Sequence, residues 1–226
     1  MRENGRVFLF AAIVPPRDVL DEVWSVTETT AAETQAGPSP AGRRKATRRR
    51  LFGGKPPAAA EPPPPVIALA PVLDVNLAMA KFGNLALNDA NRLADALRET
   101  APEWSSPRLR FGGYSTLESE NDPSVWVELE GDLDELHTII RGVHEIAKGL
   151  RLFVDRRVFQ PRVRLGGVLP HATEPHLEAL LARLARFETT PWWQTQLSLL
   201  TLVDQGPDLP NFRSFADIDL GPHVAH

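Results

Sequence analysis

The alternation of hydrophobic and polar positions predicts a chain of mixed strands and helices. Segments of strand length are continuously apolar or alternate with period two, whereas the segments between them carry an apolar residue every three or four positions. The expected strands cover residues 6–14, 66–69, 72–81, 108–116, 124–130, 162–168, about 194–203 and 212–220. The expected helices run from after Pro16 to near residue 29, from Asn88 or Asp89 onward, from Asp132 to Leu150 and over residues 174–187. This succession indicates an α+β domain with antiparallel strands.

Residues from about 30 to 65 break the pattern. They are rich in alanine, proline and arginine, and nine of the 21 prolines fall between Pro38 and Pro71. Such a composition buries too little apolar surface to offset the conformational entropy lost on ordering. We therefore predict a disordered insertion with a polyproline stretch at residues 62–65.

The same insertion concentrates positive charge. Residues 43–55 contain seven lysines and arginines, and no acid occurs between residues 34 and 60. Because the net charge of the chain is −4, the rest of it is distinctly acidic. A basic segment of this kind favours salt-sensitive binding to nucleic acid, and it is also typical of a solvated loop.

Composition narrows the class of protein. A chain of 226 residues with 42% hydrophobic content can bury the core of one domain. Zero cysteines exclude disulfides, a thiol nucleophile and cysteine-ligated zinc, and agree with a reducing cytoplasm. The apolar run at residues 7–14 is too short to span a bilayer, and the first residues lack the basic region and cleavable apolar core typical of a signal peptide. We expect a cytoplasmic monomer that does not contact a membrane.

Six short segments, taken in order, carry a resemblance to a known family. They are RVFLFAAIVPPRDV at residues 6–19, NLAMAKFG at 76–83, LRFGG at 109–113, VWVEL at 125–129, EGDL at 130–133 and FQPRVRL at 159–165. In this order and spacing the chain resembles the bacterial 2H phosphoesterases, which are named RNA 2',3'-cyclic phosphodiesterases or 2'-5' RNA ligases. The resemblance implies one bilobal domain over residues 1–226, with two pseudo-symmetric antiparallel sheets around a central cleft and the helices outside.

The chemistry of that family requires two copies of a His-x-Thr signature. Opening a 2',3'-cyclic phosphate needs a base that takes a proton from water and an acid that protonates the departing sugar oxygen. Histidine serves both roles because its ordinary pKa is about 6.5. The threonine two residues further along a strand points to the same side and donates its hydroxyl to the phosphate.

This chain has the signature at neither place. The first place holds Asn76 and Ala78, and the second holds Arg162 and Arg164. We call these four residues the motif positions. An asparagine amide does not titrate, alanine has no hydroxyl, and an arginine stays protonated, so none of the four can transfer a proton. The resemblance thus implies a catalytically impaired relative, without catalytic residues, whose ligand-binding residues are the motif positions.

Two interpretations of Arg162 and Arg164 stay open. Their guanidinium groups match phosphate oxygens, which favours binding of a phosphorylated nucleotide or an RNA end. They could equally be solvated or paired with carboxylates of the acidic chain. His171, shortly after the second motif segment, is a further candidate for contact with a ligand. No set of histidines and carboxylates has the spacing of metal ligands, so we expect no metal and no cofactor.

Two other functions are compatible with the sequence. The chain could be an interaction protein that binds a partner through its basic, proline-rich insertion. It could also be an active phosphoesterase on an unanticipated substrate, with His171 as the base. The adjacent Trp192 and Trp193 resemble a platform for stacking bases, but aromatic pairs at the start of a strand more often pack in the core or at an edge.

Overall fold

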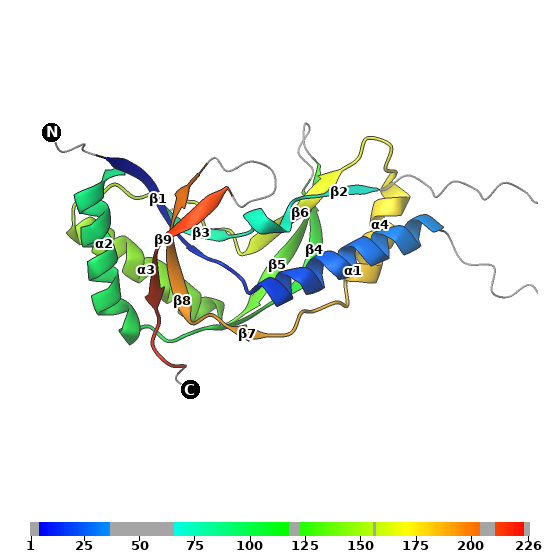
Figure 1. Cartoon of the computed structure of the whole chain (residues 1–226). Coiled ribbons are helices and arrows are strands. Elements are labelled where there is room, and N and C mark those ends of the chain that lie inside the picture. The colour runs from blue at the N-terminus through cyan, green and yellow to red at the C-terminus, as the bar shows by residue number, and fades with distance from the viewer. Residues whose placement is uncertain (1–4, 37–65, 118–122, 156, 204–210, 224–226) are drawn as a thin grey trace, which may run out of the picture.

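The computed structural model describes residues 5–36, 66–117, 123–155, 157–203 and 211–223, which form two antiparallel sheets and four α-helices (Figure 1). The strands are β1 (Arg6–Ile13), β2 (Ile67–Leu69), β3 (Leu77–Ala86), β4 (Arg108–Leu117), β5 (Ser124–Gly131), β6 (Arg162–Val168), β7 (Trp192–Trp193), β8 (Gln196–Leu202) and β9 (Phe212–Asp219). The α-helices are α1 (Arg17–Ala36), α2 (Leu87–Thr100), α3 (Leu133–Gly149) and α4 (Glu174–Leu184), and two short 3-10 turns are η1 (Val72–Asp74) and η2 (Ala101–Glu103).

The first sheet has the strand order β3-β1-β8-β9, and α2 and α3 pack against it. Its central strand β1 is buried on both faces, as its continuous apolar sequence requires. Leu9, Ala11 and Ile13 belong to the main core beneath the helices. Phe10 and Ala12 point to the other face and belong to a separate apolar cluster. The first sheet therefore has apolar side chains on both of its faces.

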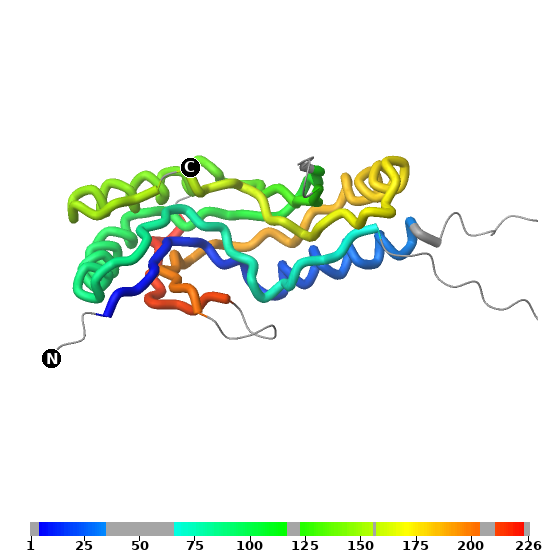
Figure 2. The backbone as a smooth tube through the Cα atoms, turned by 90° about the horizontal axis from the view of Figure 1, so that it is seen from above, coloured from blue at the N-terminus to red at the C-terminus, as the bar shows by residue number. Residues whose placement is uncertain are grey.

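The second sheet has the order β2-β6-β5-β4-β7, and α1 and α4 lie at its end of the molecule (Figure 2). Val163 and Leu165 of β6 are buried in the main core, in one cluster with residues of α1 and α4. Because strand side chains alternate, Arg162 and Arg164 lie on the opposite face of β6. Unlike the first sheet, the second sheet thus has one apolar and one polar face.

Helix α1 is longer than the sequence pattern predicts. It continues to Ala36, so residues 30–36 are helical, and the prediction of a disordered insertion from residue 30 is wrong for these residues. Packing against α4 overrides the composition, since Arg183 of α4 donates to the hydroxyl of Thr34 and pairs with Glu33. Residues 37–65, which hold the rest of the predicted insertion with its basic and polyproline stretches, lie outside the described residues.

The strand expected over residues 72–81 is divided in the structure. Residues 72–74 form the turn η1, and β3 begins at Leu77 and continues to Ala86. The turn is fixed by Asp74, whose carboxylate accepts hydrogen bonds from the backbone N–H of Asn211 at 2.6 Å and from its side-chain amide at 2.7 Å. These contacts come from the distant β8–β9 connection, which a local sequence pattern does not reveal.

The sequence pattern missed β7, a two-residue strand in which Trp192 is buried and Trp193 is 43% exposed.

In the part of the chain that the structure describes, no helix is long and apolar enough to cross a bilayer.

Candidate functional site

The structure places the two motif segments in different sheets. Ala78 lies in β3 of the first sheet, and Asn76 immediately precedes that strand. Arg162 and Arg164 lie in β6 of the second sheet. The resemblance predicts this distribution, with one signature strand in each lobe.

The surroundings of Ala78 are apolar. Its cross-strand partner is Ala12, and both belong to the cluster of Phe10, Ala12 and Leu200 on the face of the first sheet away from the main core. Phe8, Val14 and Phe212 pack against the same cluster and are partly buried. Ser198 of β8, opposite Ala12, adds a hydroxyl to this face, which donates to the carboxylate of Asp217 at 2.7 Å.

Asn76 is half-buried at the edge of this region. Its side-chain amide donates a weak hydrogen bond of 3.4 Å to the backbone carbonyl of Asp74. The side chain is therefore held by its own local turn. It can orient a ligand, but it cannot exchange a proton with one.

The surroundings of Arg162 are polar and aromatic. Its guanidinium carbon lies 5.0 Å from the centroid of the Trp126 ring, which is a cation–π arrangement. Its Nε donates to the side-chain carbonyl of Gln160 at 3.2 Å. In the sheet register Glu128 is directly opposite Arg162, and Trp126 is directly opposite Arg164, which is exposed.

Charged pairs continue across this face of the second sheet. Glu128 accepts a hydrogen bond of 2.8 Å from the hydroxyl of Ser115. Arg110 pairs with Glu130 at 3.0 Å and with Glu188 at 2.6 Å. The face therefore offers both guanidinium groups, which bind anions, and carboxylates, which accept hydrogen bonds from hydroxyls.

Sequence reasoning missed Trp126 and Glu128 as members of this site. The signal was present in VWVEL, where alternation places both residues on one face of β5. What the sequence did not reveal is that β5 pairs with β6, which brings the two residues to Arg162 and Arg164.

Backbone hydrogen bonds connect the two motif-bearing regions. Lys81 of β3 and Asp155, in the connection that leads to β6, exchange two of them, at 2.9 and 3.4 Å. The N–H of Ala70 donates to the carbonyl of Leu165 at 2.7 Å. Because Asn76 follows Ala70 by six residues, the Cα atoms of Ala70 and Asn76 are no more than about 20 Å apart.

Asp155 is also stabilised as a carboxylate. The backbone N–H of Arg157 donates to it at 3.1 Å and the Nε of Arg157 at 3.3 Å. The backbone hydrogen bond first, and then the side-chain bond, lower the pKa of the Asp155 carboxyl.

Three of the described histidines lie in different settings. His171 is exposed in the turn between β6 and α4. His137 of α3 packs its ring edge-on against Phe159, and His144 of the same helix is buried. Within the described ranges, no group of three or more histidine, aspartate or glutamate side chains could hold a metal ion.

The complete fold matches solved structures of low sequence identity. Escherichia coli LigT complexed with 3'-AMP is 13% identical with a TM-score of 0.56, and the match covers 96% of this chain and 99% of that one. This chain has the LigT fold. A structure named as a phosphoesterase is 12% identical with a TM-score of 0.55 over 96% of this chain and 99% of its own. The protein TT0787 of Thermus thermophilus is 15% identical with a TM-score of 0.52 over 94% of this chain and 97% of its own.

These matches confirm the α+β fold class predicted from the sequence. LigT itself has been crystallised with NADP+ and with ATP as well. At the level of sequence, no family model and no curated protein matches the chain.

Proposed function

We propose that this protein is a catalytically impaired relative of the 2H phosphoesterases that binds a phosphorylated nucleotide or an RNA end. The observation that carries the proposal is the identity of the motif positions. In a LigT fold, one sheet presents Asn76 and Ala78 and the other presents Arg162 and Arg164.

The argument against catalysis is chemical. Asn76 and Ala78 have no group that titrates, and Ala78 lies against an apolar cluster. Arg162 keeps its proton and lies over the ring of Trp126. Because loss of one general acid or base typically costs about 10²- to 10⁴-fold in rate, loss of both leaves no useful turnover.

The argument for binding rests on the polar face of the second sheet. Arg162 and Arg164 are separated by one residue on β6 and therefore lie on one face, where both can contact phosphate oxygens. Trp126 is directly opposite Arg164 and its ring lies beside the guanidinium of Arg162, so the site also offers an aromatic surface to a base. The Glu128 carboxylate repels phosphate but accepts hydrogen bonds from ribose hydroxyls, which favours a nucleotide over a free phosphate.

A binding experiment tests the proposal. A short RNA with a 3'-phosphate is titrated against the protein and against the Arg162→Ala, Arg164→Ala and Arg186→Ala variants. Arg186 is exposed at the end of α4 and serves as the control. We expect each of the first two substitutions to weaken binding about 10-fold, because each removes one phosphate contact. Each should also reduce the slope of log affinity against log salt concentration by about 1. Equal affinities of all four proteins would contradict the proposal.

Deleting residues 37–65 separates this site from the basic insertion. Because α1 ends at Ala36 and β2 begins at Ile67, a short Gly-Ser linker can replace the segment without removing either element. We expect the deletion to leave RNA affinity unchanged. Affinity that disappears with the deletion would place binding in the insertion and not on β6.

A further inference from the structure

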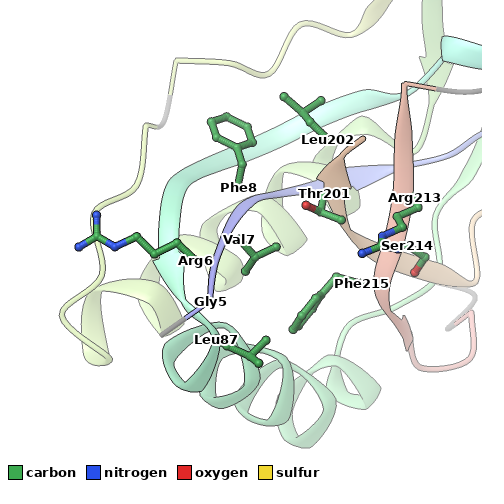
Figure 3. A pocket seen from close by; sticks show the side chains of 10 residues that line it. All are labelled: Gly5, Arg6, Val7, Phe8, Leu87, Thr201, Leu202, Arg213, Ser214 and Phe215. Atoms are coloured by element: carbon green, nitrogen blue, oxygen red, sulfur yellow. The ribbon is translucent and has the colours of Figure 1, made fainter. Parts of the chain in front are cut away.

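A cavity of about 530 Å³ lies at the end of the first sheet where β1 begins. Strand β1 pairs with β3 from Arg6 onward but with β8 only from Leu9 to Ala12. Strands β1 and β8 therefore separate on the N-terminal side of Leu9, and the start of α2 borders the space between them. The cavity is lined by Gly5, Arg6, Val7, Phe8, Leu87, Thr201, Leu202, Arg213, Ser214 and Phe215 (Figure 3).

The lining is positively charged. It contains two arginines and no acid, although the chain as a whole has a net charge of −4. Arg213 points into the cavity, whereas Arg6 points away from it (Figure 3). Among the ion pairs that join described residues, none involves Arg213. This guanidinium is therefore available to an anion.

A hydroxyl lies beside Arg213. Thr201 is its cross-strand partner, so both side chains are on the same face of the sheet. Thr201 is only 6% exposed, and within the described part of the chain its hydroxyl makes no hydrogen bond. The Thr201 oxygen is not among the buried side-chain atoms that lack a partner, so this hydroxyl reaches the cavity and can donate to an anion there.

The rest of the cavity is apolar. Val7, Leu87 and Phe215 point into it beside Arg213 and Thr201 (Figure 3). Leu87 is 50% exposed, and Leu202 at the rim is 55% exposed. Large apolar side chains that remain exposed around a charged group are typical of a binding site for an amphipathic molecule.

We propose that this cavity binds a small organic anion with an apolar body. A carboxylate or phosphate group accepts hydrogen bonds from Arg213 and Thr201, and the apolar body packs against Leu87 and Phe215. Val7 precedes Ala12, the partner of Ala78, by five residues along β1, which corresponds to about 16 Å. The cavity is therefore a separate site, and its occupancy does not depend on the function proposed for Arg162 and Arg164.

Three small probes of similar size test the ligand class: phenyl phosphate, phenylacetate and benzyl alcohol, each titrated by calorimetry or NMR. We expect at least one anion to bind with shifts at Thr201, Arg213 and Leu87, and the neutral alcohol to bind at least 10-fold more weakly because it cannot accept charge-assisted hydrogen bonds. Binding of phenyl phosphate alone or of phenylacetate alone identifies the head group. Absence of binding by both anions, or equal binding of the alcohol, would overturn the proposal.

Variants locate the site. Arg213→Ala is expected to weaken binding of the better anion by about 10- to 100-fold, the effect of losing a charged hydrogen bond. Arg213→Gln provides a second variant of similar length, and Arg186→Ala is the control that leaves binding unchanged. Leu87→Ala is expected to weaken binding of the aromatic anion but not of inorganic phosphate. Unchanged affinity in both Arg213 variants, at wild-type melting temperature, would refute the site.

Discussion

The two sheets differ around the motif positions. Ala78 in the first sheet packs against a buried apolar cluster of Phe10, Ala12 and Leu200. Around Arg162 in the second sheet, the corresponding face carries charged and aromatic side chains. One motif segment thus packs against an apolar cluster, while the other carries charged groups beside an aromatic ring.

Under the proposed function, this difference accounts for binding without catalysis. Hydrolysis of a cyclic phosphate needs a proton acceptor on one side of the phosphate and a donor on the other, so loss of either half removes the reaction. Binding needs only one face with suitable donors.

The largest effect is expected from a carboxylate placed on each face. Ala12→Asp buries a charge among Phe10 and Leu200, since Ala12 is fully buried. We expect it to lower the free energy of unfolding by more than about 3 kcal/mol. Arg164→Asp on the exposed face of β6 should change it by less than about 1 kcal/mol. Urea denaturation measures both, and similar losses would show that the two faces do not differ.

The second effect concerns the backbone beside Arg164. A Cβ on Gly166 would collide with the backbone carbonyl of Ala68 in β2. We expect Gly166→Ala to destabilise the protein by about 1–3 kcal/mol, because overpacking forces β2 and β6 apart. At Gly149 nothing lies within 4 Å of an added Cβ, so Gly149→Ala is the matched control. Equal melting temperatures for the two variants would contradict the close approach of β2 and β6.

The third effect concerns the covered face of the second sheet. The hydroxyl of Tyr114 in β4 is buried without a hydrogen-bond partner of good geometry. Burial raises the pKa of Tyr114 far above its ordinary value, and the nearby Thr27 hydroxyl lowers this pKa by a smaller amount. The unfolded chain therefore loses this proton first, and stability should fall as pH rises above about 10.

The Tyr114→Phe variant removes this titration. At neutral pH we expect its stability to stay within about 1 kcal/mol of the wild type, since no hydrogen bond is lost. Denaturation measured between neutral and alkaline pH should show a shallower decline for the variant. An identical decline in both proteins would show that Tyr114 is not the group responsible.

The smallest effect is the contact between Arg162 and Trp126. A double-mutant cycle with Arg162→Ala and Trp126→Ala should give a coupling energy of about 0.5–1 kcal/mol, as expected for a partly exposed cation–π pair. Arg108 and Trp193 form a longer pair, at 5.8 Å, which serves for comparison and should couple less strongly. A coupling energy of zero for the first pair would show that Trp126 does not hold Arg162 in position for a ligand.

Much of the fold follows from local patterns. Strand β6 has the limits that alternation predicts, and β1 differs by one residue, because a period of two or a continuous apolar run survives in the sequence. The end of α1 was mispredicted because contacts with Arg183 of α4 stabilise it. The division between η1 and β3 was missed because Asn211, 137 residues away, holds Asp74.

Some residues of the candidate site could be predicted from local patterns, and others could not. The resemblance located Arg162 and Arg164 on one strand face, since that requires only strand periodicity. Trp126 and Glu128 required the pairing of β5 with β6, and the cavity at Arg213 required the separation of β1 from β8. These are relations between distant segments, and the local periodicity of a single sequence does not predict them.

The central claim is that the motif positions of this LigT fold cannot transfer a proton. The direct test is a hydrolysis assay of the purified protein on nucleoside 2',3'-cyclic phosphates, with Arg162→Ala measured in parallel. We predict no turnover above the uncatalysed reaction for either protein. Turnover by the wild type that disappears in Arg162→Ala would contradict the claim.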